Sequence, residues 1–229
     1  MATQMNIVLV HGAWSDGSAW GKVIPRLQEA GHTVVAVQLP LTSLADDVAV
    51  TRRALDAVSG PTVLAGHSYG GAVITEAGRD VDHVTSLVYI ASFPLDAGES
   101  VGAILGQYPA MPGSADARQD GDGFLTMPPD KFGPNLAHDA DPAAVKFMAA
   151  VQHPTQGRCF ADTVGAPAWR QKPSWYQVSA DDRMVPAEAQ RFMAGRAGAT
   201  TIELPTSHIS MAAYPGEIAD LILAAAEAA

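Results

Sequence analysis

One short stretch, Gly66-His67-Ser68-Tyr69-Gly70, constrains the fold of this chain more than any other part of the sequence. It matches the pattern Gly-x-Ser-x-Gly, in which a serine occupies a sharp turn between a β-strand and an α-helix. An apolar run at 61–65 follows a Gly-Pro break and predicts a buried strand, and residues 72–77 continue as a predicted helix. Because the two glycines leave room for a strained backbone, the pattern predicts a strand–turn–helix unit with Ser68 at its corner.

Ser68 is therefore the candidate nucleophile. At this corner its hydroxyl faces the N-terminus of the following helix, where backbone N–H groups and the helix dipole favour developing negative charge. A serine hydroxyl is a weak nucleophile until a base removes its proton, and an acid must hold that base in one tautomer. The same chemistry thus requires a histidine and a carboxylate elsewhere in the chain.

The rest of the sequence predicts the fold class. Short apolar runs alternate with helical patterns, which is typical of βαβ units and of an α/β, mostly parallel, doubly wound sheet. Further strands are predicted at 6–10, 32–37, 85–91, 175–179 and 200–204, and further helices at 20–30, 43–58, from 186 and from 215. With 229 residues, the chain is expected to form a single domain, 1–229.

The interval 93–172 interrupts this alternation. It is rich in glycine, proline and aspartate, and only residues 142–151 predict a helix, with Asp141 as its N-cap. We interpret the interval as a small cap, or lid, inserted between strands over the strand ends. This placement makes it a candidate wall of the substrate site.

In the fold that this serine turn implies, the catalytic residues follow one another along the chain as serine, then acid, then histidine. The acid and the base are therefore expected in the loops that follow the later strands. Of the seven histidines, only His208 lies beyond the last predicted strand, and it is the candidate base. His67, inside the turn, is expected to pack or hydrogen-bond locally. Asp181 and Asp182 compete as the acid, because neighbouring side chains in an extended segment point to opposite sides and only one of them can face the histidine. Asp182 is preferred because it stands four residues before Pro186, where the next helix is predicted to begin, and Asp96 after the 85–91 strand is a third candidate.

Two backbone N–H groups are needed to bind the oxyanion of the tetrahedral intermediate. One is expected from Tyr69, directly after the nucleophile, and the other from Ala13, in the loop after the first strand. His11 in that loop is interpreted as a structural ring that supports it. A Gly-x-Gly-x-x-Gly dinucleotide loop does not occur there.

Composition indicates which classes of binding partner and which cellular location to expect. The formal net charge is −10, with 14 basic and 24 acidic residues and no basic run, so nucleic acid is not an expected partner. Cys159 is the only cysteine, which favours a reducing, cytoplasmic location, and no apolar stretch is long enough to span a membrane. Neither a metal nor a cofactor is expected, because a serine, a histidine and an aspartate suffice for acyl transfer.

Together, the serine turn, the His-Gly-Ala-Trp loop at 11–14, the Asp182 loop and the His208 loop resemble the α/β-hydrolase superfamily. Within it the chain resembles small bacterial relatives of the plant methyl-ester esterases and hydroxynitrile lyases, which implies a Ser-Asp-His triad and a small helical cap. The lyases differ at two positions, with threonine in place of Gly12 and lysine in place of Ile209. The resemblance therefore favours an esterase over a lyase.

Apolar side chains of the cap, with Trp14, are candidates for the substrate pocket or for the cap's own core. They are Tyr108, Met111, Phe124, Met127, Phe132, Phe147, Met148, Phe160 and Trp169. The expected function is a carboxylesterase acting on small-molecule esters of small, largely apolar acids or alcohols. A lactonase, a carbon–carbon-bond hydrolase or a ligand-binding protein on the same scaffold are the alternatives.

Overall fold

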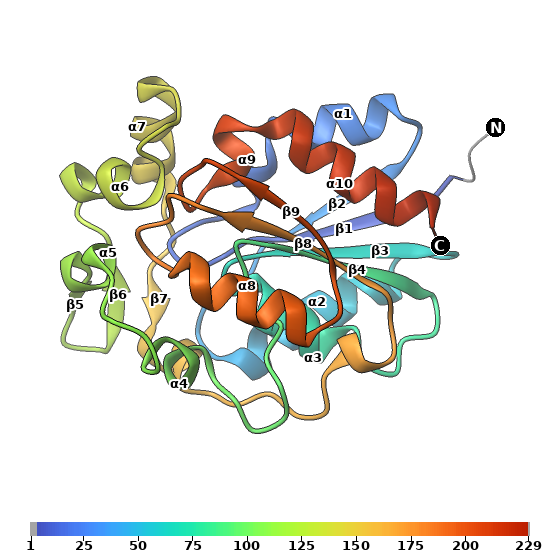
Figure 1. Ribbon diagram of the computed structural model, residues 1–229, viewed down its shortest axis with the longest axis horizontal. Coiled ribbons are helices and arrows are strands. Elements are labelled where there is room, and N and C mark those ends of the chain that lie inside the picture. Colours follow the sequence, from blue (N-terminus) through green and yellow to red (C-terminus); the bar gives the residue numbers. More distant parts are fainter. Residues whose placement is uncertain (1–3, 229) are drawn as a thin grey trace.

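The computed structural model describes residues 4–228, and its centre is a six-stranded parallel sheet (Figure 1). The strand order is β2-β1-β3-β4-β8-β9, with every neighbouring pair parallel. The strands are β1 (Asn6–Val10), β2 (Thr33–Val37), β3 (Thr62–His67), β4 (Val84–Ile90), β8 (Ser174–Ser179) and β9 (Thr200–Leu204). All six strands predicted from the sequence are confirmed. The four central strands, β1, β3, β4 and β8, are buried almost throughout, as expected for strands covered on both faces, whereas the edge strands β2 and β9 are more exposed.

Helices cover both faces of this sheet. Figure 1 shows α1 (Ile24–Glu29) and α10 (Pro215–Glu227) on one side, and α2 (Leu44–Asp56), α3 (Gly70–Ala77) and α8 (Ala187–Arg196) on the other. The predicted doubly wound arrangement is therefore confirmed. No helix within residues 4–228 is long and apolar enough to cross a membrane.

Helix boundaries follow local chemistry. Ser43 caps α2, which lies within the predicted helix at 43–58, by accepting a hydrogen bond from the N–H of Asp46. The predicted helix at 20–30 is instead a 3₁₀ turn, Gly17–Trp20, followed by α1, whose first turn contains Pro25. Pro215 is the first residue of α10, as expected, whereas Pro186 lies just before α8.

The segment between β4 and β8, called here the 93–172 segment, contains more regular structure than the sequence predicts. Helix α7 (Pro142–Val151) and its Asp141 cap are confirmed. The segment also contains α4 (Val101–Leu105), α5 (Pro112–Asp116), α6 (Pro129–Leu136) and a small antiparallel sheet of β5 (Arg118–Gln119), β6 (Phe124–Thr126) and β7 (Thr155–Gln156). These elements are too short to show a hydrophobic period, and α6 has Pro134 inside it.

The position of the 93–172 segment explains its importance for the site. In Figure 1 its helices and its small sheet lie at the end of the molecule towards which the arrow of β8 points. That end carries the loops that follow the parallel strands, and these loops contain Ser68, Asp182 and His208.

Candidate active site

Ser68 lies on a strained turn between β3 and α3. Its φ is +50°, in the left-handed region that side-chain-bearing residues seldom adopt. A Cβ on Gly66 would lie 2.6 Å from the carbonyl oxygen of Gly70, and a Cβ on Gly70 would lie 2.6 Å from that of Val10. The two glycines therefore allow the turn to close on itself and on the end of β1.

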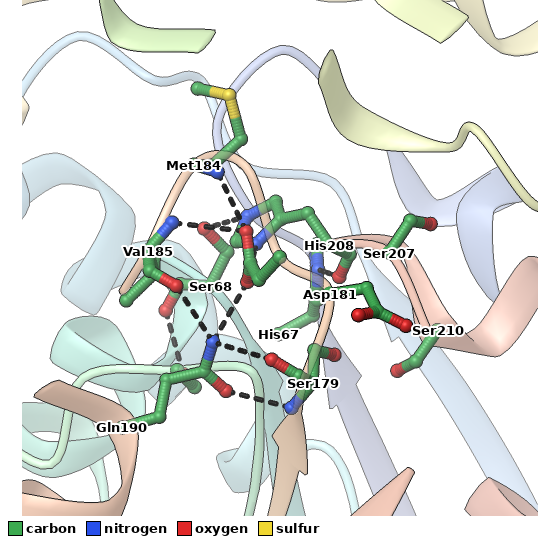
Figure 2. A network of polar contacts seen from close by, with 12 residues as sticks. His67, Ser68, Ser179, Asp181, Met184, Val185, Gln190, Ser207, His208 and Ser210 are labelled. Atoms are coloured by element: carbon green, nitrogen blue, oxygen red, sulfur yellow. Dashed lines mark hydrogen bonds and ion pairs between the residues drawn. The ribbon is translucent and has the colours of Figure 1, made fainter. Parts of the chain in front are cut away.

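A continuous hydrogen-bonded chain connects Ser68, His208 and Asp182. Ser68 Oγ lies 2.8 Å from His208 Nε2 (Figure 2). On the other side of the ring, His208 Nδ1 lies 2.7 Å from Asp182 Oδ2. All three side chains are buried. Because the carboxylate accepts the Nδ1–H, Nε2 carries the lone pair that faces the serine hydroxyl. This arrangement can remove the proton of Ser68.

Asp182 is held by donors on every side. Its Oδ1 accepts hydrogen bonds from the N–H groups of Met184 (2.7 Å) and Val185 (3.0 Å). Of the other two candidate acids, Asp181 is exposed, and Asp96 forms an ion pair with Arg170 at 2.6 Å. Only Asp182 of the three candidates lies against His208, since neighbouring side chains in an extended loop point apart.

Gln190 is a member of this network that the sequence analysis missed. Its Nε2 donates to Asp182 Oδ2 at 2.9 Å and to the Val185 carbonyl at 3.0 Å, and its Oε1 accepts from the Ser179 N–H at 2.9 Å (Figure 2). The signal was present in the sequence, because Gln190 lies on the buried face of α8 with Met193 and Ala194. A buried amide on an apolar helix face needs polar partners.

The expectation that His67 packs or hydrogen-bonds locally is wrong. Its Nε2 lies 2.9 Å from the carbonyl oxygen of His208, so the contact joins residues 141 positions apart and is not local. Burial holds the pKa of His67 well below its usual value, and the neighbouring His208 lowers it further. The neutral ring therefore donates from Nε2 and ties the Ser68 turn to the His208 loop.

The loop after β1 lies directly against Ser68. A Cβ on Gly12 would lie 2.8 Å from the Ser68 Cβ, so a larger residue would push the loop away. His11 Nε2 accepts the Leu39 N–H at 3.0 Å and Nδ1 donates to the Gly12 carbonyl at 2.8 Å. Burial lowers the pKa of His11 to about 4, so the ring is neutral and supports the loop through both nitrogens.

The two candidate oxyanion donors lie on either side of this contact. Ala13 follows Gly12, and Tyr69 follows Ser68 at the start of α3. Within residues 4–228, the N–H groups of Ala13 and Tyr69 have no acceptor. Both are thus available to bind an oxygen that develops negative charge beside Ser68.

A small apolar cavity of about 190 Å³ opens beside Ser68. Its lining consists of Ala13, Trp14, Ser68, Phe93, Val101, Leu105, Ser114, Ala117, Leu125, Phe160, Met184, Val185 and His208. His208 is the one titratable side chain in this lining. The cavity therefore suits an uncharged, largely apolar group.

The predicted pocket residues need correction. Trp14 and Phe160 line the cavity, but the other candidates do not. The residues outside the lining are Tyr108, Met111, Phe124, Met127, Phe132, Phe147, Met148 and Trp169. Phe132 is buried, and Phe147 is 54% exposed. The Trp169 indole N–H donates a hydrogen bond to the Leu95 carbonyl. Apolar character alone does not distinguish a pocket wall from a core residue.

Most of the chain is similar in sequence to known proteins. The model of the alpha/beta hydrolase family matches residues 7–221. A carbendazim hydrolyzing esterase of Nocardioides sp. is 34% identical over 143 residues, 55% of this chain and 56% of that protein. An alpha-hydroxynitrile lyase of Arabidopsis thaliana is 25% identical over 222 residues, covering 84% of this chain and 85% of the lyase.

A solved structure shows the same fold. The structure of a methylesterase from Arabidopsis superposes with a TM-score of 0.81 at 19% identity, over 98% of this chain and all of that one (100%). These matches confirm the resemblance that the sequence motifs indicated.

Proposed function

This chain belongs to the alpha/beta hydrolase family, and we propose that it is a serine esterase that cleaves carboxylic esters of small, largely apolar acids or alcohols. The observation that carries the proposal is the Ser68–His208–Asp182 chain of hydrogen bonds, with separations of 2.8 and 2.7 Å, at the edge of an apolar cavity. The esterase among the relatives supports the same reaction class.

In the proposed mechanism, Ser68 Oγ attacks the ester carbonyl carbon while His208 Nε2 takes the hydroxyl proton. Asp182 stabilises the resulting imidazolium. The N–H groups of Ala13 and Tyr69 bind the oxyanion. Collapse of the tetrahedral intermediate expels the alcohol, which receives the proton from His208. Water then attacks the acyl-enzyme by the same route and releases the acid.

The cavity supports the substrate class. Its lining is apolar apart from two serines and His208, so a charged acid or alcohol group would be desolvated without a partner. Its volume of about 190 Å³ favours short chains. Two residues favour ester over cyanohydrin chemistry: Gly12 lies against Ser68, and Ile209, which replaces the lysine of the lyases, is buried.

The proposal is tested by time-resolved hydrolysis of p-nitrophenyl acetate and butyrate. Wild type is expected to give a burst of p-nitrophenol followed by turnover, and Ser68→Ala to give neither. Ser86→Ala is the matched control, because it also removes a buried serine hydroxyl, one that lies in β4 and donates to the Ala225 carbonyl of α10. It should retain wild-type kinetics.

Two results would overturn the proposal. Equal slow hydrolysis by wild type and Ser68→Ala would mean that the reaction does not use Ser68. Cleavage of mandelonitrile without turnover of either ester would identify a lyase instead.

A further inference from the structure

A buried carboxylate outside the triad lies directly behind the Ser68 turn. Asp47, in the first turn of α2, is fully buried. Its Oδ2 accepts the Tyr69 hydroxyl at 2.7 Å, and its Oδ1 accepts the Leu41 N–H at 2.8 Å. The Cys159 thiol lies 3.9 Å from the same Oδ2. All three contacts come from uncharged groups, so the carboxylate is held by hydrogen bonds and not by an ion pair.

Such an arrangement is costly to build. Burial raises the pKa of Asp47 to about 6, against the opposing effect of the Tyr69 and Leu41 hydrogen bonds. Burial also raises the pKa of Tyr69, so its hydroxyl keeps its proton and donates it to the carboxylate. A buried carboxylate with no cation nearby is a poor way to gain stability, because desolvation opposes it. Its position behind the nucleophile suggests a different use.

Tyr69 connects this carboxylate to the chemistry. The residue directly follows Ser68, and its N–H is one of the two proposed oxyanion donors. At the other end of the residue the ring is fully buried and its hydroxyl donates to Asp47. The ring centroid lies 6.1 Å from that of Phe160, in an edge arrangement. Because the two ends belong to one residue, anchoring the hydroxyl restricts the rotation and displacement of the peptide N–H.

The same carboxylate also holds the chain on its other side. Leu41 has a φ of +53°, a strained conformation for leucine, and its N–H is bound to Asp47. The Leu41 carbonyl in turn accepts the N–H of Gln156 in β7 at 2.8 Å. Asp47 therefore lies between the Ser68 turn and the 93–172 segment.

We propose that Asp47 is a positioning residue that acts through Tyr69: by binding the tyrosine hydroxyl, it aligns the Tyr69 N–H with the oxyanion. The proposal rests on the proposed function, since it assigns Asp47 a role in stabilising an oxyanion formed at Ser68. It predicts an effect on the tetrahedral state that exceeds any effect on substrate binding.

The test compares three single variants. Tyr69→Phe deletes only the hydroxyl. Asp47→Asn keeps the shape of the side chain but has one acceptor oxygen in place of two. Because the Leu41 N–H will occupy that oxygen, the amide NH2 group faces the Tyr69 hydroxyl and can donate a hydrogen bond to it. Tyr89→Phe is the matched control, because Tyr89 is equally buried and its hydroxyl lies 3.0 Å from that of Thr75, away from Asp47.

Two readouts separate positioning from simple stability. The first is kcat and KM for p-nitrophenyl butyrate. The second is inhibition by a short alkyl trifluoromethyl ketone: Ser68 Oγ adds to its carbonyl carbon, His208 takes the serine proton, and the ketone oxygen becomes an oxyanion. The corresponding secondary alcohol has the same shape and forms no oxyanion, and its Ki measures binding alone.

We expect Tyr69→Phe to lower kcat about tenfold, a fraction of the 10²–10³ that loss of a whole oxyanion donor costs. KM and the Ki of the alcohol should change less than about twofold, while the Ki of the ketone rises in parallel with the fall in kcat. Asp47→Asn should lower kcat about threefold, and the double variant should be no slower than Tyr69→Phe, because both act through one contact.

Several outcomes would overturn the inference. They are a folded Tyr69→Phe variant with wild-type kcat and ketone Ki, an equal loss in Tyr89→Phe, and additive losses in the double variant. Absence of Ser68-dependent turnover in wild type is a separate result, and it would overturn the proposed esterase function together with this inference.

Discussion

The loops around Ser68 are held from two sides, and the two sides use different kinds of contact. On the sheet side, the start of each loop is held mainly by backbone contacts. Val10 at the end of β1 is in register with Gly66 of β3, and the Ser68 N–H donates to the Ile90 carbonyl of β4 at 3.0 Å. These positions follow from strand pairing and from the close approach that glycine allows.

On the other side, residues of the 93–172 segment bind the same loops mainly through side chains. The Trp14 N–H donates to Thr155 Oγ1 and its indole N–H to the Leu125 carbonyl, each at 3.0 Å. Asp139 Oδ2 accepts the Thr206 hydroxyl at 2.7 Å and the Ser207 N–H at 3.0 Å, immediately before His208. The segment thus restrains both the loop after β1, through Trp14, and the loop that leads to His208.

The difference separates two tasks. The sheet determines where each loop begins, so a change there should affect the chemistry itself. The 93–172 segment restrains the loops further out and supplies much of the cavity wall, so a change there should affect selectivity and fine alignment.

The largest effect is expected on the sheet side, at Asp182. Replacing it with asparagine should lower kcat by about 10⁴-fold, because an amide cannot hold His208 in the required tautomer or stabilise its cation. Asp181→Asn provides the adjacent control and should stay within about twofold of wild type. Steady-state kinetics with p-nitrophenyl butyrate measures both. A loss of similar size in Asp181→Asn would show that the loop, and not the individual carboxylate, is decisive.

The next prediction concerns stability, through His11. Burial lowers its pKa from 6.5 to about 4, so the folded protein keeps the ring neutral where the unfolded chain binds a proton. This contribution is fully present above pH 6.5 and is lost as the pH falls through 4, and it amounts to about 3 kcal/mol. In urea unfolding between pH 4 and 7, His11→Gln should therefore show a flatter acid dependence than wild type.

Asp47 supplies a contrast of opposite sign in the same pH range. Its pKa is raised from 3.8 to about 6 by burial, so its contribution is fully present below pH 3.8 and is lost as the pH rises through 6. Asp47→Asn should consequently lose stability more steeply on acidification than wild type. Parallel unfolding curves for wild type and both variants would contradict the assigned burial of the two groups.

On the side of the 93–172 segment, Leu125→Ala should change selectivity. Leu125 lines the cavity from β6, and its truncation enlarges the space beside Ser68. The ratio of kcat/KM for p-nitrophenyl octanoate to that for the acetate should rise about tenfold. Phe147→Ala, in the same segment but 54% exposed, should leave the ratio unchanged. An unchanged ratio in Leu125→Ala would remove this cavity from the substrate site.

The smallest effect is expected at Asp139. Asp139→Ala should lower kcat about fivefold by releasing the residues before His208, and Asp139→Asn should recover most of the loss because its oxygen still accepts. Asp141→Ala removes the cap of α7 in the same segment and should lower the melting temperature without changing kcat. A loss at Asp139 as large as at Asp182 would erase the distinction between the two sides.

The sequence predicts the sheet side well and the 93–172 segment poorly. Strands and long helices leave periodic patterns, and the turn at Ser68 leaves a spaced motif. Helices of five residues and strands of two or three do not, so the sequence does not predict α4, α5 or β5–β7. Their existence depends on contacts with the loops beneath them.

Within the site, the same limit separates individual residues. The sequence alone determined that Ser68, Asp182 and His208, in this order along the chain, each lie in a loop after a recognisable strand. Only the tertiary structure decided that Asp182 and not Asp181 meets His208, that Gln190 binds that carboxylate, and that Phe132 and Trp169 lie outside the cavity. Local patterns encode which elements form, whereas side-chain partners depend on residues far apart in the sequence that folding brings together.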